Sequence, residues 1–562
     1  MPAVDSATPE LRRALRAIKR AGRGPQVAAF FDYDGTVIGG YSASAFYEHR
    51  IRHREIGPIE LARTLLARRR GIHSGEEFGS FLELSLAAWE GRDEQELEEL
   101  GEALFKHAIA SRLHLEVWRL VQEHKAMGHT LVLASSATRF QVEPMARELG
   151  ADVVLCTPLE VVDGRVTGRV ADEPLWGEGK ARAVRALASE RKLDLQAAFA
   201  YSNGTEDIEF LAAVGRPMAV QPDDGLRAEA RRRGWPVLEC ASRGGRPGLR
   251  DLARTGAFYG AFAGAALTGA GAGLLNRSRS TMVEITGGVG ADVGLSLAGV
   301  RVDVVRGSEN LWATRPCVFV FNHQSKLDPI VLMKLLRSGF TGVAKAEAKN
   351  VPGFGQLFQL AGVAFVERGD SRQARRALEP AVAKLRDEGI SLVIAPEGTR
   401  SATPRLGRFK KGPFHIAMQA QVPMVPIVLR NVGEVMWRGA QVLSPGTIEV
   451  AVLPAVDTTG WSAGTIDEHV AEVREMFLDT LSAWPGEGTL KGTPSGAQAG
   501  GDGRGRQPSR RRPAAGRKPV SATAARPRAK SKRSSSRADA PRSGSGPAGG
   551  RLPAARRAGG GS

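Results

Sequence analysis

The sequence predicts an α/β protein in which two parallel-sheet domains follow each other along the chain. Short apolar runs alternate with helical stretches over residues 27–240 and again over residues 301–484, and this alternation is typical of a parallel sheet with helices on its faces. A chain of 562 residues is also too long for one hydrophobic core. We therefore expect two α/β domains, joined by residues 241–300 and followed by a tail at residues 485–562.

The first domain is expected to carry a helical cap. Residues 38–128 separate its first two apolar runs and have a mostly helical pattern, as in "DEQELEELGEALFKHAIA". That insertion is too long for a simple crossover between parallel strands, which usually takes a dozen or so residues. The runs expected to form the strands lie at residues 27–31, 130–134, 153–155, 198–202 and 217–220.

A basic helix is expected within residues 1–26. The stretch "ELRRALRAIKRAG" is helical in pattern, and the apolar core of a signal peptide does not follow it. We expect a solvated helix here, with a peripheral membrane contact as the alternative.

The joining segment contains a candidate membrane-embedded helix. Residues Thr255 to Asn276 form a run of 22 residues without charge, bracketed by Arg254 and Arg277, and a spanning helix needs about 20 apolar residues. Its many glycines and alanines suit close helix packing in lipid. The next weakly charged stretch, at residues 285–300, is interrupted by Asp292. A buried or loop-rich Gly/Ala linker is the alternative.

The tail carries most of the net charge. From residue 491 to the end there are 18 basic and two acidic residues, which give this segment a net charge of +16 (18 − 2). The net charge of the whole chain is +18. A segment so poor in large apolar residues cannot bury enough surface to fold, so we predict disorder. The tail could contact anionic lipid, bind nucleic acid or only aid solubility. Three scattered cysteines argue against a disulfide framework and fit a reducing compartment.

The motif "FFDYDGT" places Asp32 and Asp34 at the end of the first apolar run. Two carboxylates so close favour a hard divalent cation, and one can attack phosphorus while the other moves a proton. A surface Asp-Gly turn is the alternative. Further polar groups follow later runs: Ser135 in "LVLASSAT", Lys180 in "WGEGKARAV", and the pair Asn203 and Asp207 in "AYSNGTEDIEFL".

This order of residues resembles the haloacid dehalogenase-like phosphatases, and most of all the phosphoserine-phosphatase type with a helical cap. The resemblance covers about residues 25–240 and implies a Rossmann-like fold. It implies that Asp32 forms an aspartyl-phosphate and that Asp34 protonates the leaving oxygen and then activates water. Ser135 and Lys180 would hold the phosphoryl oxygens.

The same resemblance implies a Mg²⁺ site formed by the carboxylates of Asp32 and Asp207 and the backbone carbonyl of Asp34. Asn203 stands where many relatives have aspartate, so the metal shell loses one negative charge, although the amide can still act as a ligand. A phosphatase-like domain that is inactive and serves regulation or scaffolding is therefore the alternative.

The motif "NHQSKLD" places His323 directly after the apolar run at residues 317–321 and Asp328 five residues later. With a helix starting at Gln324 or Ser325, Asp328 would lie one turn on. It would accept the Nδ1 proton of the imidazole and leave Nε2 as a base. A capped helix start with a packed histidine is the alternative.

Three later blocks add a cationic site. "GVAFVERGD" contains Arg368, "IAPEGTRSA" contains Arg400, and "VPMVPIVL" contains Pro426 just before a predicted strand. Two arginines in one crevice suit a phosphate, which guanidinium groups bind through paired hydrogen bonds. Together with "NHQSKLD", these blocks resemble the glycerolipid acyltransferases that acylate 1-acylglycerol-3-phosphate, over about residues 300–460.

The resemblance implies that His323, oriented by Asp328, deprotonates the free hydroxyl of a lysophospholipid. The oxygen would then attack an acyl thioester of acyl-CoA or acyl-carrier protein. Pro426 would shape the acyl side. The residues implied in glycerol-phosphate binding are Arg368, Glu397, Gly398, Thr399 and Arg400.

The two resemblances together predict a bifunctional, membrane-associated enzyme of phospholipid synthesis. Mg²⁺-dependent phosphoryl chemistry and acyl thioesters both belong to the cytoplasm, so both catalytic domains should face it. A single crossing by the joining segment would separate them. We therefore expect residues 255–300 to form a re-entrant or interfacial helical pair, or to cross twice.

Overall fold

The computed structural model of the chain describes residues 8–57, 75–241, 248–350, 354–366, 379–380, 382–438 and 440–485. The predicted phosphate ligand Arg368 and nearly all of the predicted disordered tail lie outside these residues.

A six-stranded parallel sheet forms the centre of the first domain, in the order β3-β2-β1-β6-β7-β8. From β1 the sheet grows in one direction through β2 to β3, and from β6 it grows in the opposite direction through β7 to β8. The carboxyl ends of β1 and β6 therefore lie at a topological switch point. The two-residue strand β8 was not predicted. The strands are β1 (Ala28–Asp32), β2 (Thr130–Thr138), β3 (Val153–Thr157), β6 (Phe199–Ser202), β7 (Arg216–Val220) and β8 (Val237–Leu238).

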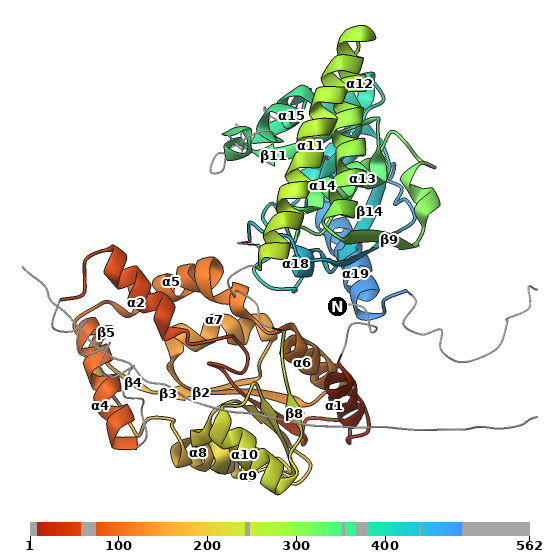
Figure 1. Cartoon of the computed structure of the whole chain (residues 1–562). Helices are drawn as coiled ribbons and strands as arrows, with labels where there is room; N and C mark the ends of the chain where they lie inside the picture. Colours follow the sequence, from red (N-terminus) through yellow and green to blue (C-terminus); the bar gives the residue numbers. More distant parts are fainter. Residues whose placement is uncertain are drawn as a thin grey trace, which may run out of the picture. The chain divides into compact units, whose positions relative to one another are not determined.

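Helices cover both faces of this sheet (Figure 1). Alternate residues of β1 point to opposite faces, so Ala29 and Phe31 join one buried cluster while Ala28 and Phe30 join another. The first cluster includes residues of α1 (Pro9–Lys19), α6 (Leu115–Met127) and α7 (Arg139–Leu149). The second includes residues of α8 (Glu178–Arg191), α9 (Ile208–Ala212) and α10 (Asp224–Arg233).

The expectation of a solvated N-terminal helix is wrong. Leu11, Ala14 and Ile18 of α1 are buried and belong to the core of the first domain. The basic residues of α1 face outward, so the helix is amphipathic and uses its apolar stripe for the sheet. That stripe is consequently not available to a membrane.

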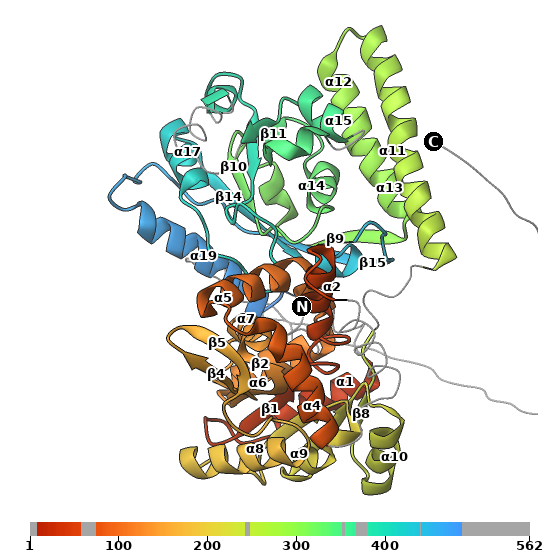
Figure 2. The same cartoon turned by 90° about the vertical axis from the view of Figure 1, so that its left-hand side faces the viewer.

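The predicted cap at residues 38–128 ends before α6, and the cap also includes a later hairpin that was not predicted. Helix α6 packs on β2 and α1 with most of its residues buried, so it belongs to the sheet domain. The hairpin turns at Asp163 and Gly164, which both have positive φ, as an Asp-Gly type I′ turn requires. The cap elements are α2 (Ala43–Arg52), α4 (Gly75–Leu86), α5 (Glu94–Leu104), β4 (Leu159–Val162) and β5 (Arg165–Val170) (Figure 2).

The second domain has a seven-stranded sheet in the order β12-β11-β13-β10-β14-β15-β9. The first five strands are parallel, β15 runs antiparallel to β14, and β9 is parallel to β15. Strands β9 and β11 were not predicted. The strands are β9 (Val300–Arg306), β10 (Val318–Phe321), β11 (Phe340–Lys345), β12 (Ala364–Val366), β13 (Ser391–Ile394), β14 (Met424–Arg430) and β15 (Gly446–Val452).

Two buried clusters again lie on opposite faces of this sheet. Phe319 and Ile427 pack in a cluster with residues of α14 (Asp328–Leu336) and of the joining segment. Val318 and Val428 pack in the other cluster with residues of α17 (Gly412–Ala420) and α19 (Ile466–Ser482).

The joining segment forms a helical hairpin on the second domain. Helix α11 (Leu249–Leu275) lies along α12 (Arg279–Glu284) and α13 (Gly290–Leu297), which are joined by a π-helical turn (Figures 1 and 2). Helix α11 begins before Thr255, so part of the predicted linker is helical. Phe258 and Phe262 of α11 enter the core of the second domain, and Thr255 Oγ1 accepts the Leu443 N–H at 3.0 Å.

Glycines allow the close approach within this hairpin. A Cβ added to Gly269 would lie 2.7 Å from Thr286 Oγ1 and 2.8 Å from the Met282 carbonyl oxygen, whereas one added to Gly264 would meet nothing. We expect Gly269→Val to force α11 and α12 apart and to lower the free energy of unfolding by about 1–3 kcal/mol, the usual cost of overpacking. Gly264→Val makes the same change in helix propensity without the clash. Thermal unfolding of both variants in detergent checks this, and equal midpoints would contradict it.

A chain of buried hydrogen bonds ties α6 to the sheet of the first domain. His129 Nε2 lies 2.8 Å from the Gly22 carbonyl oxygen, which can only accept, so this nitrogen carries the proton. Neutral His129 Nδ1 then accepts from His124 Nδ1 at 2.8 Å, and His124 Nε2 accepts from the Tyr201 hydroxyl at 2.8 Å. Burial, and then His129, lowers the pKa of His124 well below its usual value.

These histidines predict loss of stability in acid. An unfolded histidine binds a proton below about pH 6.5, whereas folded His124 stays neutral, so the unfolded state gains protons as the pH falls. The free energy of unfolding should decrease below that pH by about 1.4 kcal/mol per pH unit for each such histidine. We expect His124→Gln to flatten this slope and His415→Gln, in the second domain, to leave it unchanged. Hydrogen exchange of the β6 amides, corrected for intrinsic rates, measures the free energy of unfolding at each pH. An identical pH dependence in the wild type and both variants would contradict the prediction.

Candidate functional site

The first site lies at the carboxyl ends of β1 and β6, which are neighbours in the sheet. Lys180, near the start of α8, places its Nζ 2.8 Å from Asp32 Oδ1 and 2.6 Å from Asp207 Oδ2. Ser202 Oγ donates to the same Asp207 oxygen at 2.6 Å. All four side chains are buried, so the three charged groups form a desolvated network.

Burial and charge act in opposite directions on this network. Burial raises the pKa of Asp32, and the Lys180 ammonium opposes that effect. Burial lowers the pKa of Lys180, but the Asp207 and Asp32 carboxylates outweigh it, so the pKa of Lys180 is raised overall. Lys180 therefore stays charged and provides a fixed cation beside the Asp32 oxygens, where a phosphoryl group would develop negative charge.

Asp34 lies in the turn that follows β1 and is held by Ser42. The Ser42 N–H donates to Asp34 Oδ1 at 2.7 Å, and the Ser42 hydroxyl donates to Asp34 Oδ2 at 3.0 Å. Gln141 Nε2 in turn donates to Ser42 Oγ at 3.2 Å. Burial raises the pKa of Asp34 to about 7, although the Ser42 hydrogen bonds lower it. A carboxyl group with this pKa can act as an acid and then as a base near neutral pH.

The residues around Asp32 fit a hard divalent cation. Thr36 Oγ1 lies 2.9 Å from Asp32 Oδ2 and 3.0 Å from Asn203 Oδ1, so these two oxygens lie close together. Asp207 Oδ1 is buried and accepts no hydrogen bond from the described residues. An all-oxygen set that includes carboxylates suits Mg²⁺. Asp32, Asn203 and Asp207 are therefore the residues that could hold it.

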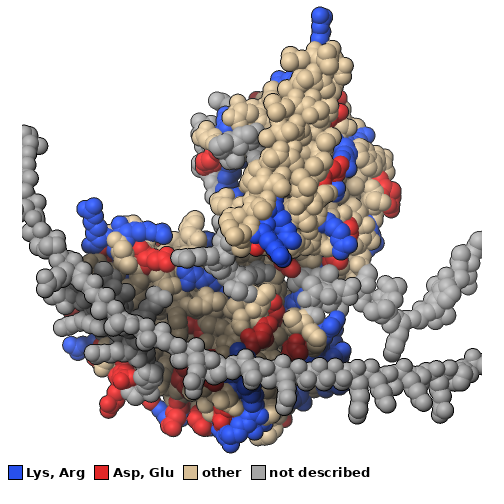
Figure 3. Space-filling view, in the orientation of Figure 1, with Lys and Arg blue, Asp and Glu red and all other residues tan. Residues whose placement is uncertain are grey.

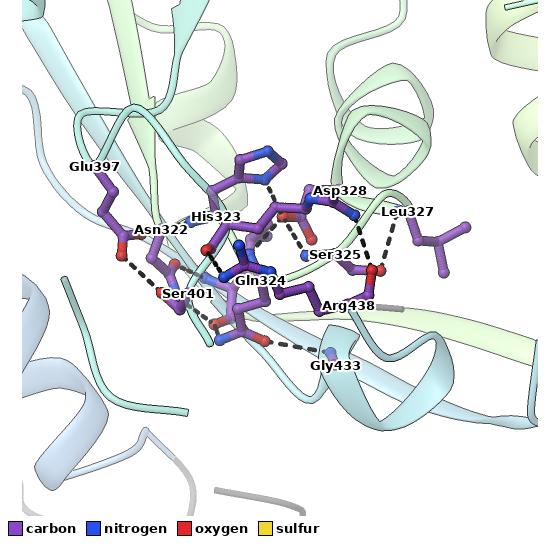
Figure 4. Close-up of polar contacts among 12 residues, drawn as sticks. Asn322, His323, Gln324, Ser325, Leu327, Asp328, Glu397, Ser401, Gly433 and Arg438 are labelled. Atoms are coloured by element: carbon purple, nitrogen blue, oxygen red, sulfur yellow. Dashed lines mark hydrogen bonds and ion pairs between the residues drawn. The ribbon is translucent and has the colours of Figure 1, made fainter. Parts of the chain in front are cut away.

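The second site is built on the loop between β10 and α14 (Figure 4). His323 Nδ1 lies 2.7 Å from Asp328 Oδ2, and the same oxygen accepts the backbone N–H groups of Gln324 at 2.7 Å and Ser325 at 2.9 Å. Helix α14 starts at Asp328, so the expected helix start at Gln324 or Ser325 is wrong. The carboxylate reaches the imidazole because the loop wraps around it. With Nδ1 as donor, Nε2 of the partly exposed ring is left as a base.

Glu397 supports the histidine from the turn that follows the neighbouring strand β13. Its Oε1 accepts the His323 N–H at 2.7 Å, and its Oε2 accepts the Ser401 hydroxyl at 2.7 Å and the Gly407 N–H at 2.8 Å. The Ser401 N–H donates to the His323 carbonyl oxygen at 2.8 Å. Burial raises the pKa of Glu397, against these hydrogen bonds. Both carboxylate oxygens are thus engaged within the protein, an arrangement that positions the His323 loop.

Asn322 fixes the other side of the loop to β14. Its Nδ2 donates to the Leu429 carbonyl oxygen at 2.9 Å, and its Oδ1 accepts the Leu429 N–H at 2.7 Å. Gln324 Nε2 donates to the same carbonyl at 3.0 Å, and Ser325 Oγ donates to the Met436 carbonyl oxygen at 2.5 Å. The His323 loop is therefore tied to β14 on one side of β10 and to the segment that follows β13 on the other.

Two cations lie near this carboxylate–imidazole pair. Burial lowers the pKa of Arg400 while Asp328 raises it, and burial together with Arg400 lowers the pKa of Lys326. Arg400 and Arg438 are locked to each other, because each donates from Nη1 to the other's carbonyl oxygen, at 3.0 and 2.7 Å. Lys326 is exposed and Arg400 is half-buried. Two cations that repel each other favour a bound anion. Lys326 was missed by sequence reasoning, although it lies inside "NHQSKLD".

Comparison with known proteins finds a family match in each half of the chain. Residues 29–212 match the family model described as haloacid dehalogenase-like hydrolase, and residues 303–430 match the model described as acyltransferase. A phosphoserine phosphatase of Mycobacterium tuberculosis is 34% identical over 243 residues, which are 42% of this chain and 79% of the relative. This chain belongs to the haloacid dehalogenase-like hydrolases. Its C-terminal half is an acyltransferase domain, so both halves belong to enzyme families.

Relatives of the acyltransferase domain are matched over shorter shares of their length. A 1-acyl-sn-glycerol-3-phosphate acyltransferase of Limnanthes alba is 33% identical over 187 residues, which are 33% of this chain and 66% of the relative. The chain thus spans just under two thirds of the first curated relatives it matches. The crystal structure of a 1-acyl-sn-glycerophosphate acyltransferase from Thermotoga maritima is 26% identical, with 42% of this chain and 97% of that chain covered and a TM-score of 0.36.

Several of the predicted hydrolase residues lie together, and one is placed differently from the expectation. The structure joins Asp32, Lys180 and Asp207 through hydrogen bonds. Ser135 follows Ala134, the register partner of Asp32, but β2 continues to Thr138 instead of ending at Ser135. Sequence reasoning missed three hydroxyl donors to the carboxylates of this site, namely Thr36, Ser42 and Ser202. Thr36 lies inside "FFDYDGT" and Ser202 inside "AYSNGTEDIEFL", whereas Ser42 lies outside the motifs.

The structure brings several of the predicted acyltransferase residues together and places Pro426 differently from the expectation. His323, Asp328, Glu397 and the Arg400 loop meet at the carboxyl ends of β10 and β13. Gly398 has a φ of +66° and lies at the turn after β13, a conformation that favours glycine, and Thr399 follows it. Pro426 lies inside β14, opposite Val320, and not before the strand as expected.

Proposed function

We propose that the acyltransferase domain transfers an acyl chain to the free hydroxyl of 1-acylglycerol-3-phosphate and so forms phosphatidate. The observation that carries this proposal is the hydrogen bond between His323 and buried Asp328 beside the cations Lys326 and Arg400. A base next to an anion-binding group suits an acceptor that carries a hydroxyl and a phosphate. The substrate in the name of the related acyltransferases agrees with this chemistry.

In the proposed reaction His323 Nε2 removes the proton of the acceptor hydroxyl as its oxygen attacks the thioester carbonyl carbon. The Asp328 carboxylate stabilises the imidazolium that forms. The tetrahedral intermediate then expels the thiolate of CoA or of acyl-carrier protein, which takes up the proton from His323. Lys326 and Arg400 hold the phosphate of the acceptor, and Glu397 keeps the His323 backbone in place.

Acyl transfer in vesicles tests the proposal. The full chain is mixed with radiolabelled acyl-CoA and lysophosphatidate, and the lipid product is separated. Phosphatidate should form, while lysophosphatidylcholine, whose phosphate carries a choline, should be a poor acceptor. Efficient use of lysophosphatidylcholine, or no labelled lipid from either acceptor, would overturn the proposal.

Lys326 provides a sharper prediction. Lys326→Met keeps the length and apolar stem of the side chain and removes its charge. A charge-assisted hydrogen bond contributes about 1.5–3 kcal/mol, so we expect KM for lysophosphatidate to rise about ten- to hundredfold, with a smaller effect on KM for acyl-CoA. The matched variant Lys411→Met removes an exposed lysine that pairs with Asp467. Equal KM values for the two variants would exclude Lys326 from the phosphate site.

We infer that the hydrolase domain is a phosphomonoesterase that works through an aspartyl-phosphate. Asp32 attacks phosphorus, Asp34 protonates the leaving oxygen, and the same carboxylate then takes a proton from the water that cleaves the acyl phosphate. Lys180 and Ser135 hold phosphoryl oxygens. Bound Mg²⁺ would offset the charge of the phosphoryl oxygens. The pKa of about 7 at Asp34 supports this, because both of its steps need a carboxyl group that changes protonation near neutral pH.

A regulatory role without catalysis is the second candidate for this domain. Asn203 is the observation that favours it, because an amide supplies no negative charge next to Asp32. Release of phosphate from para-nitrophenyl phosphate with and without Mg²⁺ decides between the two. Mg²⁺-dependent release of phosphate by the full chain excludes a purely regulatory role. No phosphate release at any Mg²⁺ concentration supports that role.

We further propose that the helical hairpin lies in the membrane interface with both catalytic domains on the cytoplasmic side. By length and composition α11 is the only helix in the described part of the chain that could cross a membrane. Its outer face is largely uncharged (Figure 3), and Leu267 and Leu274 are 77% and 80% exposed. The opposite face, with Phe258 and Phe262, is buried in the acyltransferase core. A helix with one face in the protein suits an interfacial position better than a full crossing.

Protease protection tests this topology. A protein inserted into oriented vesicles should be cleaved near both ends from the same side. Protection of one end only would show that the segment crosses once and would contradict the proposal.

A further inference from the structure

Three metal-binding side chains meet in the hydrolase domain outside the Asp32 network. His114, Glu116 and Cys240 each place one ligand atom within 4.8 Å of those of the other two. His114 and Cys240 are buried and Glu116 is half-buried. None of the steps proposed for either enzyme uses them.

The fold brings these residues together from two distant parts of the chain. His114 directly precedes α6, and Glu116 lies in the first turn of that helix. Cys240 follows β8 at the far edge of the sheet. The Ala241 N–H donates to Glu116 Oε1 at 3.1 Å, and Gln221 Nε2 donates to the Cys240 carbonyl oxygen at 2.7 Å. These bonds hold the cluster in place before any ligand binds.

From this arrangement we propose that His114, Glu116 and Cys240 form a Zn²⁺ site. Imidazole nitrogen, thiolate sulfur and carboxylate oxygen are the three donor types that zinc prefers, and the sulfur disfavours Mg²⁺ and Ca²⁺. Zinc bonds of about 2.0–2.3 Å place tetrahedral ligands roughly 3.3–3.8 Å apart. The ligand atoms therefore need to approach one another by at most about 1.5 Å, which side-chain rotation supplies.

The charges of the proposed site balance. Binding replaces the thiol proton of Cys240, which leaves to solvent, and forms a sulfur–zinc bond. The thiolate and the carboxylate together neutralise the dication, and the imidazole binds as a neutral ligand. Three protein ligands leave a fourth position, which water fills.

Zinc at this position would fix two functional segments. Cys240 is close to the end of the hydrolase domain, where the chain continues toward α11, so the ion would anchor the start of the joining segment. The His114 N–H donates to the Val37 carbonyl oxygen at 2.9 Å, and Val37 lies in the loop after Asp34. Metal bound here would therefore stabilise that loop as well, although it touches no reacting atom.

Zinc binding by the full-length protein tests the proposal. Metal-free protein is titrated with Zn²⁺ in excess Mg²⁺, in competition with a chromophoric chelator. One tight equivalent is expected in the wild type. Cys240→Ser and His114→Gln should weaken it at least a hundredfold, and Glu116→Gln should weaken it less. Cys156→Ser, which removes another cysteine of the same domain, and Asp32→Asn, which alters the Mg²⁺ site, should retain it.

Cobalt supplies a readout that does not depend on stability. Co²⁺-loaded wild type should show a thiolate-to-metal charge-transfer band that Cys240→Ser lacks and Glu116→Gln keeps. The proposal is overturned if the wild type binds no tight equivalent, if Cys240→Ser and His114→Gln keep it, or if Asp32→Asn alone removes it.

Discussion

His323→Ala is expected to abolish acyl transfer almost completely, with a decrease in kcat of about 10²–10⁴-fold or more. The substitution removes the only base that the described residues place against Asp328 Oδ2. The acceptor hydroxyl has a pKa far above neutral, so its oxygen attacks a thioester slowly unless a base removes the proton during attack. KM for lysophosphatidate should change little, because Lys326 and Arg400 remain. Initial rates with labelled acyl-CoA measure both constants.

A control and a second variant separate catalysis from folding. His415→Ala removes a histidine of α17 in the same domain and should keep nearly full activity. Asp328→Asn keeps the shape of the carboxylate and an acceptor oxygen for the imidazole and the two backbone N–H groups. It lacks the charge that stabilises the imidazolium, so kcat should again fall by orders of magnitude. A fully active His323→Ala, or loss of activity in His415→Ala, would exclude His323 as the base.

The central strands of both sheets could be predicted from sequence because they are continuous apolar runs. "VAAFF" and "CVFVF" are buried on both faces, and only a central parallel strand needs such a run. Strand β9 reads "VRVDVVR", with charged residues at positions 301, 303 and 306, because it lies at the sheet edge and exposes one face. The short strand β8 has too few residues to show any periodicity. Edge strands of this kind are set by tertiary pairing more than by their own sequence.

The candidate catalytic residues could be proposed from sequence because chemistry limits the choice of side chain. Asp32, Lys180, His323 and Asp328 belong to short motifs whose spacing reports a strand end and a turn. Ser42 binds the Asp34 carboxylate and Ser202 binds the Asp207 carboxylate just as directly, but a serine near a turn is common in any sequence. Their roles depend on the path of the backbone in three dimensions. The same holds for Glu397, whose motif predicted substrate binding while its contacts join two loops.

Asp32→Asn is expected to eliminate phosphate release while leaving acyl transfer within about twofold of the wild type. The amide cannot form the acyl phosphate, so turnover should fall by at least about 10⁴-fold. Lys180 keeps Asp207 as an ion-pair partner, so the variant does not leave an unpaired buried charge. Exposed Asp194, changed to asparagine as a control in the same domain, should have no effect on either activity.

The covalent intermediate distinguishes this mechanism from direct attack by water. Wild-type protein quenched during turnover of a labelled phosphate ester should carry label that neutral hydroxylamine releases, as an acyl phosphate requires. Asp32→Asn should carry none, and Asp34→Asn should carry little, because the leaving oxygen is no longer protonated. Phosphate release by Asp32→Asn at the wild-type rate would show that water attacks directly. No contact within either site links the two activities, so acyl transfer should survive in Asp32→Asn. Loss of acyl transfer in this variant would show that the acyltransferase domain depends on the Asp32 network.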